Sequence, residues 1–179
     1  MITSAAVVSP LMKTPRLKTP RIDTARLTRR APRRTDFATW AEVLCPVRAK
    51  YIGGPVSEDQ AWFDFRLNTA NRLPRGHAMW TVEDRSGEGL GFVLIGFEPG
   101  EREPELGSLF RAGAEGQGHA TEAAAARDHA LDRLRLPALV CDIAPDIARS
   151  LALARRFGAT PEGHLDGCQI RRHHPKGQR

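Results

Sequence analysis

The sequence predicts a mixed α/β fold in a single domain. Its 179 residues, 41% of them hydrophobic, are enough for one core and few for two domains. Strand-like runs and amphipathic helical stretches follow in the order strand, two helices, three strands, helix, strand, helix, two strands. Because strands and helices are interspersed, we expect the helices to pack on one mixed sheet.

Residues 1–20 hold three prolines and show neither helical nor strand periodicity. This composition predicts a flexible basic leader. A loosely alternating stretch over residues 23–33 predicts the first strand. We expect Asp36 to cap a first helix that runs to Leu44 and ends before Pro46.

A capping box predicts the second helix. Ser57 and Gln60 have the required spacing, and a tight turn at Gly53–Gly54–Pro55 precedes them. The apolar positions expected to pack are Trp62, Phe63 and Leu67.

Three strands are expected next. They cover residues 77–83, 90–97 and 105–111, with a hairpin turn at 86–89 between the first two.

The stretch over residues 114–134 sets two glycines directly before a run of helix formers. Gly116 and Gly118 leave the backbone without Cβ atoms just where the first N–H groups of a helix have no partner within the helix. Such a segment either binds an anion or makes a simple turn. The apolar face expected for this helix, which Pro137 ends, consists of Ala123, Ala126, Ala130 and Leu134.

The C-terminal part completes the predicted sheet. Residues 139–143 indicate a buried strand, and Asp146 is expected to cap a helix that Gly158 ends. Two short strands, over residues 159–164 and 168–173, follow it.

The net charge of +6 is concentrated at the two ends of the chain. Residues 1–34 hold nine Lys and Arg against one acid, residues 171–179 hold four bases and no acid, and the part between them carries −6. A nucleic-acid-binding groove more often carries its bases on the folded surface, interleaved with aromatic residues, which make up only 6% here. We therefore expect nucleic acid to bind only through the basic ends, if at all.

Cysteine usage and hydropathy predict a soluble cytoplasmic protein. The chain has an odd number of cysteines, Cys45, Cys141 and Cys168, and their spacing is not that of metal ligands. We therefore expect neither a disulfide framework nor a bound metal. His173 and His174, near Cys168, have no second ligand pair and are expected in a solvated basic tail. No apolar run approaches the roughly 20 residues of a membrane span.

Two nucleotide-binding motifs fit the glycines poorly. A dinucleotide fingerprint that uses Gly116, Gly118 and Asp142 requires Gly or Ala where Thr121 stands, and its βαβ unit comes late, behind three strands. The phosphate-binding loop of nucleotide hydrolases requires a following Gly-Lys-Ser/Thr, which is missing.

Several short motifs stand in a fixed order along residues 21–174. The segment Glu115–Ala120 has glycine and alanine at the third and fifth positions after its glutamate, and Thr121–Glu122–Ala123 follows it. The other motifs are Tyr51–Pro55, Glu105–Gly107, Ala144–Asp146 and Arg156–Ala159. Together they resemble the GNAT acetyltransferases, and in particular the branch of ribosomal-protein N-terminal acetyltransferases.

The resemblance implies a single-domain GNAT-like fold over residues 21–174, followed by a basic tail at 175–179. It implies a mixed, mostly antiparallel sheet of six to seven strands with splayed central strands, flanked by about four helices. Acetyl-CoA is the implied co-substrate, its pyrophosphate bound by backbone N–H groups before the central helix. The implied contacts with acetyl-CoA are Leu109, Phe110, Arg111, Glu115, Gly116, Gln117, Gly118, His119, Ala120, Thr121 and Ser150.

Acetyl transfer needs a neutral amine, a polarised thioester carbonyl and a proton for the thiolate. An N-terminal α-amine, with a pKa of about 7.7–8, is partly neutral at pH 7, whereas a lysine near 10.4 needs more help. The resemblance implies Glu105 as the general base, directly or through water, an exposed strand glutamate being the alternative. A backbone N–H near Leu109 or Phe110 would polarise the carbonyl.

The proton donor is expected on the last helix, where the branch carries Asn-x-x-Ser. Ser150 matches the serine, while Ile147 stands at the asparagine position. Ser150 either serves CoA and its thiolate or bonds its own helix backbone. Tyr51, Trp62 and Phe65 are expected on the acceptor side.

These observations predict an N-acetyltransferase that works by direct attack in a ternary complex, as a monomer or homodimer. The expected acceptor is a protein N-terminal α-amine or a small-molecule amine. Two alternatives stay open. One is an acyl-CoA-binding module with weak or no catalysis, and the other is a basic-tailed protein that docks on RNA or the ribosome.

Overall fold

The computed structural model describes residues 19–71, 79–96, 103–123, 125–175 and 177. Nearly all of the leader expected over residues 1–20, the start of the strand expected from His77, and most of the tail lie outside the described residues. The division into leader, domain and tail therefore stays a prediction. Within the described part of the chain, no helix has the length and apolar character needed to cross a membrane.

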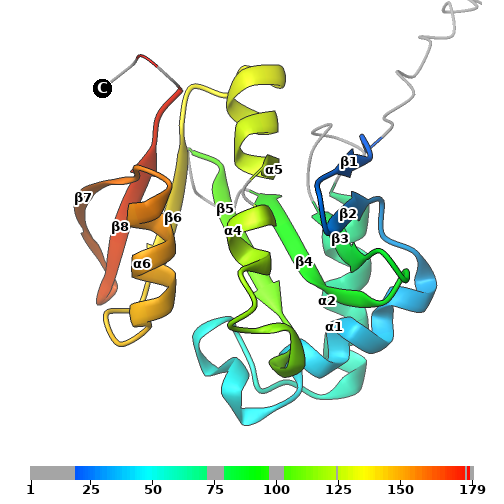
Figure 1. The fold of residues 1–179 in the computed structure, drawn as a ribbon. Coiled ribbons are helices and arrows are strands. Elements are labelled where there is room, and N and C mark those ends of the chain that lie inside the picture. Colours follow the sequence, from blue (N-terminus) through cyan, green and yellow to red (C-terminus); the bar gives the residue numbers. More distant parts are fainter. Residues whose placement is uncertain (1–18, 72–78, 97–102, 124, 176, 178–179) are drawn as a thin grey trace, which may run out of the picture.

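A single sheet of eight strands forms the centre of the molecule, in the order β1-β2-β3-β4-β5-β6-β8-β7 (Figure 1). Neighbours are antiparallel except β5 and β6, which are parallel, so the mixed, mostly antiparallel sheet is confirmed. There is one strand more than expected, because the stretch over residues 23–33 forms a hairpin of two strands. The strands are β1 (Ile22–Asp23), β2 (Leu27–Arg30), β3 (Met79–Asp84), β4 (Gly89–Gly96), β5 (Glu105–Phe110), β6 (Leu139–Ile143), β7 (Thr160–Leu165) and β8 (Cys168–His173).

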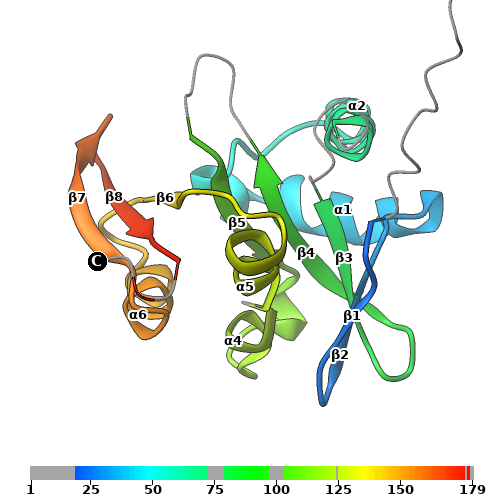
Figure 2. The ribbon, with the colours of Figure 1, turned by 90° about the horizontal axis from the view of Figure 1, so that it is seen from above.

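Helices cover both faces of this sheet. Helices α1 and α2 lie on one face, and α4, α5 and α6 lie on the other (Figure 2). The α-helices are α1 (Phe37–Leu44), α2 (Glu58–Ala70), α4 (His119–Ala123), α5 (Ala125–Asp128) and α6 (Ala148–Arg156). Short 3-10 helices are η1 (Arg34–Asp36), η2 (Val47–Tyr51) and η3 (Ala112–Ala114), and η4 (His129–Arg133) is π-helical.

Helix α2 begins as predicted but buries a different face. The Gln60 N–H donates to the Ser57 hydroxyl at 3.2 Å, which confirms the cap. Ala61 and Phe65 are the buried positions, whereas Phe63 and Leu67 are 57% and 49% exposed. The expectation that these last two pack in the core was wrong, because they lie on the side of the helix opposite to the buried pair.

The helical segment after the two glycines is less regular than the sequence predicts. Ala126 and Ala130 are buried as expected. The Leu134 N–H, however, donates to the His129 carbonyl five residues back, at 3.0 Å, which makes the last turn π-helical. The wider turn shifts the buried side, so that Leu131 is buried and Leu134 is only half-buried.

Neither aspartate expected to cap a helix does so. Asp36 and Ile147 occupy the N-cap positions of α1 and α6, without a side-chain cap bond in either helix. The Asp36 carboxylate instead accepts two hydrogen bonds from Arg30, at 2.7 and 2.9 Å. Asp146 accepts a hydrogen bond from the Tyr51 hydroxyl. Each aspartate side chain thus accepts its hydrogen bond from a side chain of another element, an arginine or a tyrosine, and not from an N–H group of the helix.

The Arg30–Asp36 pair belongs to a buried cluster that joins β2, β3 and α1. Arg30 also donates to Glu83 at 2.5 Å, and the Thr81 hydroxyl donates to Asp36 at 2.7 Å. Burial raises the pKa of the Asp36 carboxyl, but the hydrogen bonds from Arg30, Thr81 and the Arg33 backbone outweigh burial and lower it. One guanidinium therefore compensates two buried carboxylates.

We expect Arg30→Met to lower the free energy of unfolding by about 3–5 kcal/mol, because it leaves Asp36 and Glu83 buried without a cation. Arg21→Met is the matched control. Arg21 pairs with Asp23 at the surface, with 59% of its side chain exposed, and its loss should cost less than about 1 kcal/mol. Urea denaturation of both variants measures the difference, and equal losses would contradict it.

Candidate functional site

The opening between β5 and β6 is the first feature of the candidate site. The two strands pair only through Glu105 and Val140, where the Val140 N–H donates to the Pro104 carbonyl at 3.0 Å. Beyond that point the Cys141 thiol, not a backbone N–H, donates to the Leu106 carbonyl at 3.0 Å. The strands therefore diverge toward their C-terminal ends, as expected for splayed central strands.

Backbone groups of β5 alternate between β4 and this opening. The Arg111 N–H donates to the Leu90 carbonyl at 3.1 Å, so residue 111 is turned toward β4. Because the direction alternates along a strand, Leu109 is also turned toward β4, while Ser108 and Phe110 face the opening. Of the two N–H groups considered for polarising a thioester, that of Phe110 faces the opening.

The loop between β5 and α4 closes the C-terminal end of the opening. Gly116 and Gly118 have φ values of +74° and +77°, which L side chains rarely adopt, so glycine is required by the backbone conformation. The Glu122 N–H donates to the Gly118 carbonyl at 3.2 Å and begins the helical hydrogen bonding. The N–H groups of residues 119–121 precede that bond and have no acceptor within the helix.

Other expected loop residues support the loop from within. The His119 ring lies with Nδ1 3.2 Å from the Ala114 carbonyl, and the Gln117 amide donates to the Gly113 carbonyl at 2.8 Å. Ala120 and Thr121 are half-buried in the first turn of α4.

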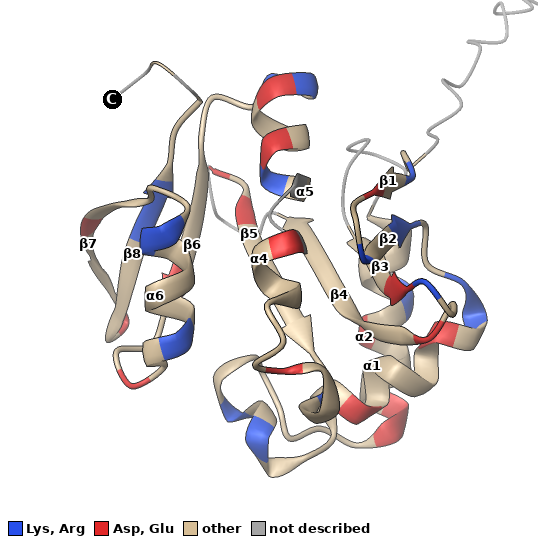
Figure 3. Cartoon of the chain, viewed as in Figure 1, with Lys and Arg blue, Asp and Glu red and all other residues tan. Residues whose placement is uncertain are grey.

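Arginines that we did not predict surround the loop. Arg149 donates to the Glu115 carboxylate at 2.8 Å, and Arg48 binds the same carboxylate and donates to the Phe110 carbonyl at 3.1 Å. Arg156 donates to the Thr121 hydroxyl at 2.8 Å. Figure 3 shows the basic residues of η2 and α6 on two sides of this loop. The spacing of seven between Arg149 and Arg156 was a usable signal, since it places both on one helix face.

Arg111 points elsewhere. Its guanidinium binds Glu88, in the turn between β3 and β4, and lies 3.9 Å from the Glu42 carboxylate of α1. Its side chain is therefore occupied by acids away from the loop.

The two expected catalytic residues lie in different parts of the opening. Glu105 is half-buried where β5 and β6 are still paired, and Ser150 is half-buried in the first turn of α6. Burial, aided by the Glu105 charge, raises the pKa of the Cys141 thiol to about 12, so this thiol is protonated at neutral pH. Ile147, at the position of the usual asparagine, packs against the cluster of Ile143 and Leu151.

The three expected acceptor residues do not converge. Tyr51 is 41% exposed and its hydroxyl binds Asp146, next to the start of α6. Trp62 and Phe65 are part of an aromatic cluster, and Phe65 is only 4% exposed. Trp62 packs edge-on against Phe37, with ring centroids 4.9 Å apart. The structure thus brings only Tyr51 to the start of α6.

No metal centre is present among the described residues, where no group of three His, Cys, Asp or Glu side chains could hold an ion. The expectation that His173 belongs to a solvated tail was wrong, because it is the last residue of β8 and only 2% exposed. Its Nε2 lies 3.5 Å from the Cys141 thiol.

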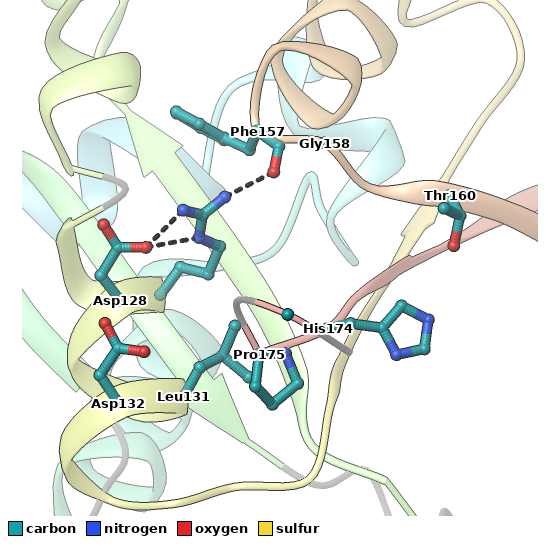
Figure 4. A pocket seen from close by; sticks show the side chains of 10 residues that line it. Asp128, Leu131, Asp132, Phe157, Gly158, Thr160, His174 and Pro175 are labelled. Carbon is teal, nitrogen blue, oxygen red and sulfur yellow. Dashed lines mark hydrogen bonds and ion pairs between the residues drawn. The ribbon is translucent and has the colours of Figure 1, made fainter. Parts of the chain in front are cut away.

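A separate cavity of about 300 Å³ lies near the C-terminal ends of α5 and α6 (Figure 4). The glycine loop precedes the N-terminal end of the α4–α5 segment, and Ser150 is in the N-terminal turn of α6. The cavity lies at the other ends of these helices and is therefore distinct from the opening between β5 and β6. Arg127, in its wall, donates to Asp128 at 2.9 Å and to the Phe157 carbonyl at 2.6 Å. Its other lining residues are Leu131, Asp132, Gly158, Thr160, His174, Pro175 and Gly177.

Comparison with known families shows which family the chain belongs to. The acetyltransferase (GNAT) domain family matches residues 26–160. The chain belongs to the GNAT acetyltransferases. The resemblance drawn from the motifs is therefore confirmed, and acetyl-CoA is the co-substrate of the family. No curated protein matches the chain.

Solved GNAT structures agree with this assignment. An acetyltransferase from Agrobacterium tumefaciens str. C58 is 34% identical, with a TM-score of 0.80 over 87% of this chain and 94% of that one. RimL, a ribosomal L7/L12 α-N-protein acetyltransferase solved with CoA, has a TM-score of 0.73 at 19% identity, covering 89% and 100%. Spermidine N-acetyltransferase from Vibrio cholerae, with CoA and spermine, has a TM-score of 0.66 at 23% identity, covering 83% and 94%. The last two share the fold.

We expect His173 to make the stability of this GNAT protein pH-dependent. Burial, aided by the Arg127 charge, lowers the pKa of His173 to about 4, from 6.5 in the unfolded chain. As pH falls through that window the unfolded state binds more protons, so the free energy of unfolding falls by up to about 1.4 kcal/mol per pH unit. Above pH 6.5 this contribution is constant.

Urea denaturation at pH 7, 6 and 5 measures this slope. His173→Gln should flatten it, whereas the control His164→Gln, which changes an exposed histidine of β7, should keep it. An unchanged slope in His173→Gln would show that other groups cause the dependence.

Proposed function

We propose that this protein is an acetyl-CoA-dependent N-acetyltransferase that transfers acetyl to a primary amine, either a protein N-terminal α-amine or a small-molecule amine. The divergence of β5 and β6 directly above a glycine-bearing loop is the observation that carries the proposal. It provides unpaired strand edges for an extended acyl-pantetheine arm and N–H groups for the diphosphate at its end.

In the proposed complex the diphosphate lies on the N–H groups of residues 118–121. Arg149 and Arg156 of α6, and Arg48 of η2, stand near enough to Glu115 and Thr121 to supply positive charge there. Guanidinium groups bind phosphate oxygens by paired, charge-assisted hydrogen bonds. Glu115, an acid beside the diphosphate, is tolerated because two arginines already neutralise it.

The acetyl group would then reach the place where β5 and β6 separate. The Phe110 N–H faces the opening and would polarise the thioester carbonyl, and Glu105 would accept the amine proton directly or through water. Ser150, in the first turn of α6, would protonate the departing thiolate or hold the arm. An α-amine is already partly neutral at pH 7, so it demands less of the base than a lysine does.

One observation favours a second candidate, an acyl-CoA-binding module with weak or no catalysis. Ile147 is packed in a core cluster and has no amide to offer the cofactor. A catalyst releases CoA when an amine is added, whereas a binder is only stabilised by acetyl-CoA. The described residues give no support to the RNA-docking alternative, because Arg21, Arg26 and Arg30, in the described part of the basic end, form ion pairs within the fold.

We expect millimolar acetyl-CoA to raise the melting temperature of the protein, and Gly118→Glu to abolish that rise. Glutamate at this position adds a negative side chain where the diphosphate should lie. Gly167→Glu is the matched control, since Gly167 has a similar φ of +84° in the β7–β8 turn and open space around the position of an added Cβ. It should keep the rise. No rise in the wild type would contradict the proposal.

Glu105→Gln should lower kcat by about a hundredfold or more if Glu105 is the base. The measurement is CoA release with peptides that carry free N-terminal α-amines and with small primary amines. Glu103→Gln, which changes a neighbouring acid bound to Arg172, should retain wild-type kcat. Equal kcat values in the two variants would remove Glu105 from the mechanism.

A further inference from the structure

The turn between β1 and β2, residues 24–26, packs against the segment that leads into α4. The Thr24 hydroxyl donates to Glu122 Oε1 at 2.6 Å, and the Arg26 N–H donates to the same oxygen at 2.8 Å. Arg26 Nε donates to Oε2 of this carboxylate at 2.7 Å. A glutamate in the first turn of α4 is thus bound three times by one turn at the edge of the sheet.

Arg26 also reaches a second acceptor in the loop. Its Nη1 donates to the Gln117 carbonyl oxygen at 3.0 Å, and Nη2 lies 3.4 Å from where a Cβ on Gly118 would stand. The carbonyl and N–H of one trans peptide unit point in opposite directions. The bond to Gln117 therefore directs the Gly118 N–H away from Arg26.

The peptide unit between Gln117 and Gly118 has little else to fix its orientation. Gly118 has a φ of +77°, and glycine adopts positive and negative φ about equally well. Gln117 and Gly118 are both exposed, so packing does not hold this unit. Its orientation depends on the hydrogen bond from Arg26.

The anchor of Arg26 is charged at neutral pH. Burial raises the pKa of Glu122, but hydrogen bonds from Thr24 and Arg26 outweigh burial and hold it at about 2. Arg29, on β2, faces the same turn of α4 and donates to the Glu122 carbonyl at 3.0 Å. The ion pair between Arg26 and Glu122 is therefore present throughout the neutral range.

We propose that Arg26 is a positioning residue, which keeps the Gly118 N–H turned toward the diphosphate of acetyl-CoA, and that Glu122 anchors Arg26 in this role. The inference rests on the proposed function, because it takes the loop to be the diphosphate site. It makes the turn at residues 24–26, far from the loop in sequence, part of the cofactor-binding machinery.

Glu122→Gln distinguishes positioning from simple electrostatics by the sign of its effect. If the carboxylate acted on the diphosphate only through its charge, its removal would tighten CoA binding. If it anchors Arg26, the loss of charge-assisted hydrogen bonds weakens binding, and we expect the Kd for CoA to rise about tenfold. An unchanged or lower Kd, measured by calorimetry, overturns the inference.

Arg26→Lys tests the geometry at constant charge. One ammonium on a flexible stem does not reproduce the fork that spans a carboxylate and a carbonyl, so we expect a rise in Kd for CoA of about tenfold here too. The NMR chemical shift of the Gly118 amide in the free protein should move as well. Arg21→Ala, which removes a paired surface arginine that precedes β1 and does not contact Glu122 or the loop, should leave both unchanged. Wild-type binding by Arg26→Lys overturns the inference.

The wild type and Gly118→Glu separate the failure of this inference from that of the proposed function. If the wild type does not bind CoA, both fail. If it binds and Gly118→Glu does not, while Glu122→Gln and Arg26→Lys bind like the wild type, the inference alone fails. The Arg26 side chain is 54% exposed, so its replacement is compatible with a folded protein, which melting curves verify.

Discussion

The divergence of two parallel strands is the constraint on which the rest of this structure depends. Strands β5 and β6 meet at one pair only, yet neither lacks support. Strand β5 is paired with β4 over six residues, and β6 is paired with β8 over five. Each strand is held from its outer side, so the inner backbone groups are left for a ligand without loss of sheet stability. In the proposed complex the acyl-pantetheine arm lies in this opening.

The two glutamates near the start of α4 serve different purposes in the proposed complex. Glu115 lies at the mouth and binds Arg48 and Arg149, which come from segments on two sides of the loop. A diphosphate presents one negative charge on each phosphate and similar acceptor oxygens, so these arginines can contact it while they still neutralise Glu115. Glu122 faces the opposite way, toward the β1–β2 turn, and keeps its arginine. One acid therefore shares its arginines with the diphosphate, and the other is part of the support.

The sequence was sufficient to predict the structural features that depend on patterns of neighbouring residues. The capped start of α2 at Ser57, the strands of the sheet and the glycine loop all follow from spacing and propensity within a few residues. Predictions failed where a side chain of another element competes with the N–H groups of the helix: Asp36 is bound by Arg30 of β2, and Asp146 by Tyr51 of η2. The buried face of α2 was misjudged because Phe63 and Leu67 are as apolar as the residues that pack. Hydrophobicity alone does not tell two such faces apart.

Contacts between segments far apart in the sequence limit the prediction of the candidate site even more than that of the fold. The motif that resembles the GNAT pyrophosphate loop indicated where we propose that acetyl-CoA binds, but not what holds the loop in shape. Arg26 and Glu122 are separated by 96 residues, and each is an ordinary surface residue in its own segment. Only the packing of the edge hairpin against α4 joins them. Arg85 and Trp80 in turn hold this hairpin, through hydrogen bonds to the Ala25 and Pro20 carbonyls at 3.2 and 3.1 Å. Strand β3 and the turn after it therefore support the hairpin, the hairpin supports the loop, and in the proposed complex the loop presents its N–H groups to the cofactor.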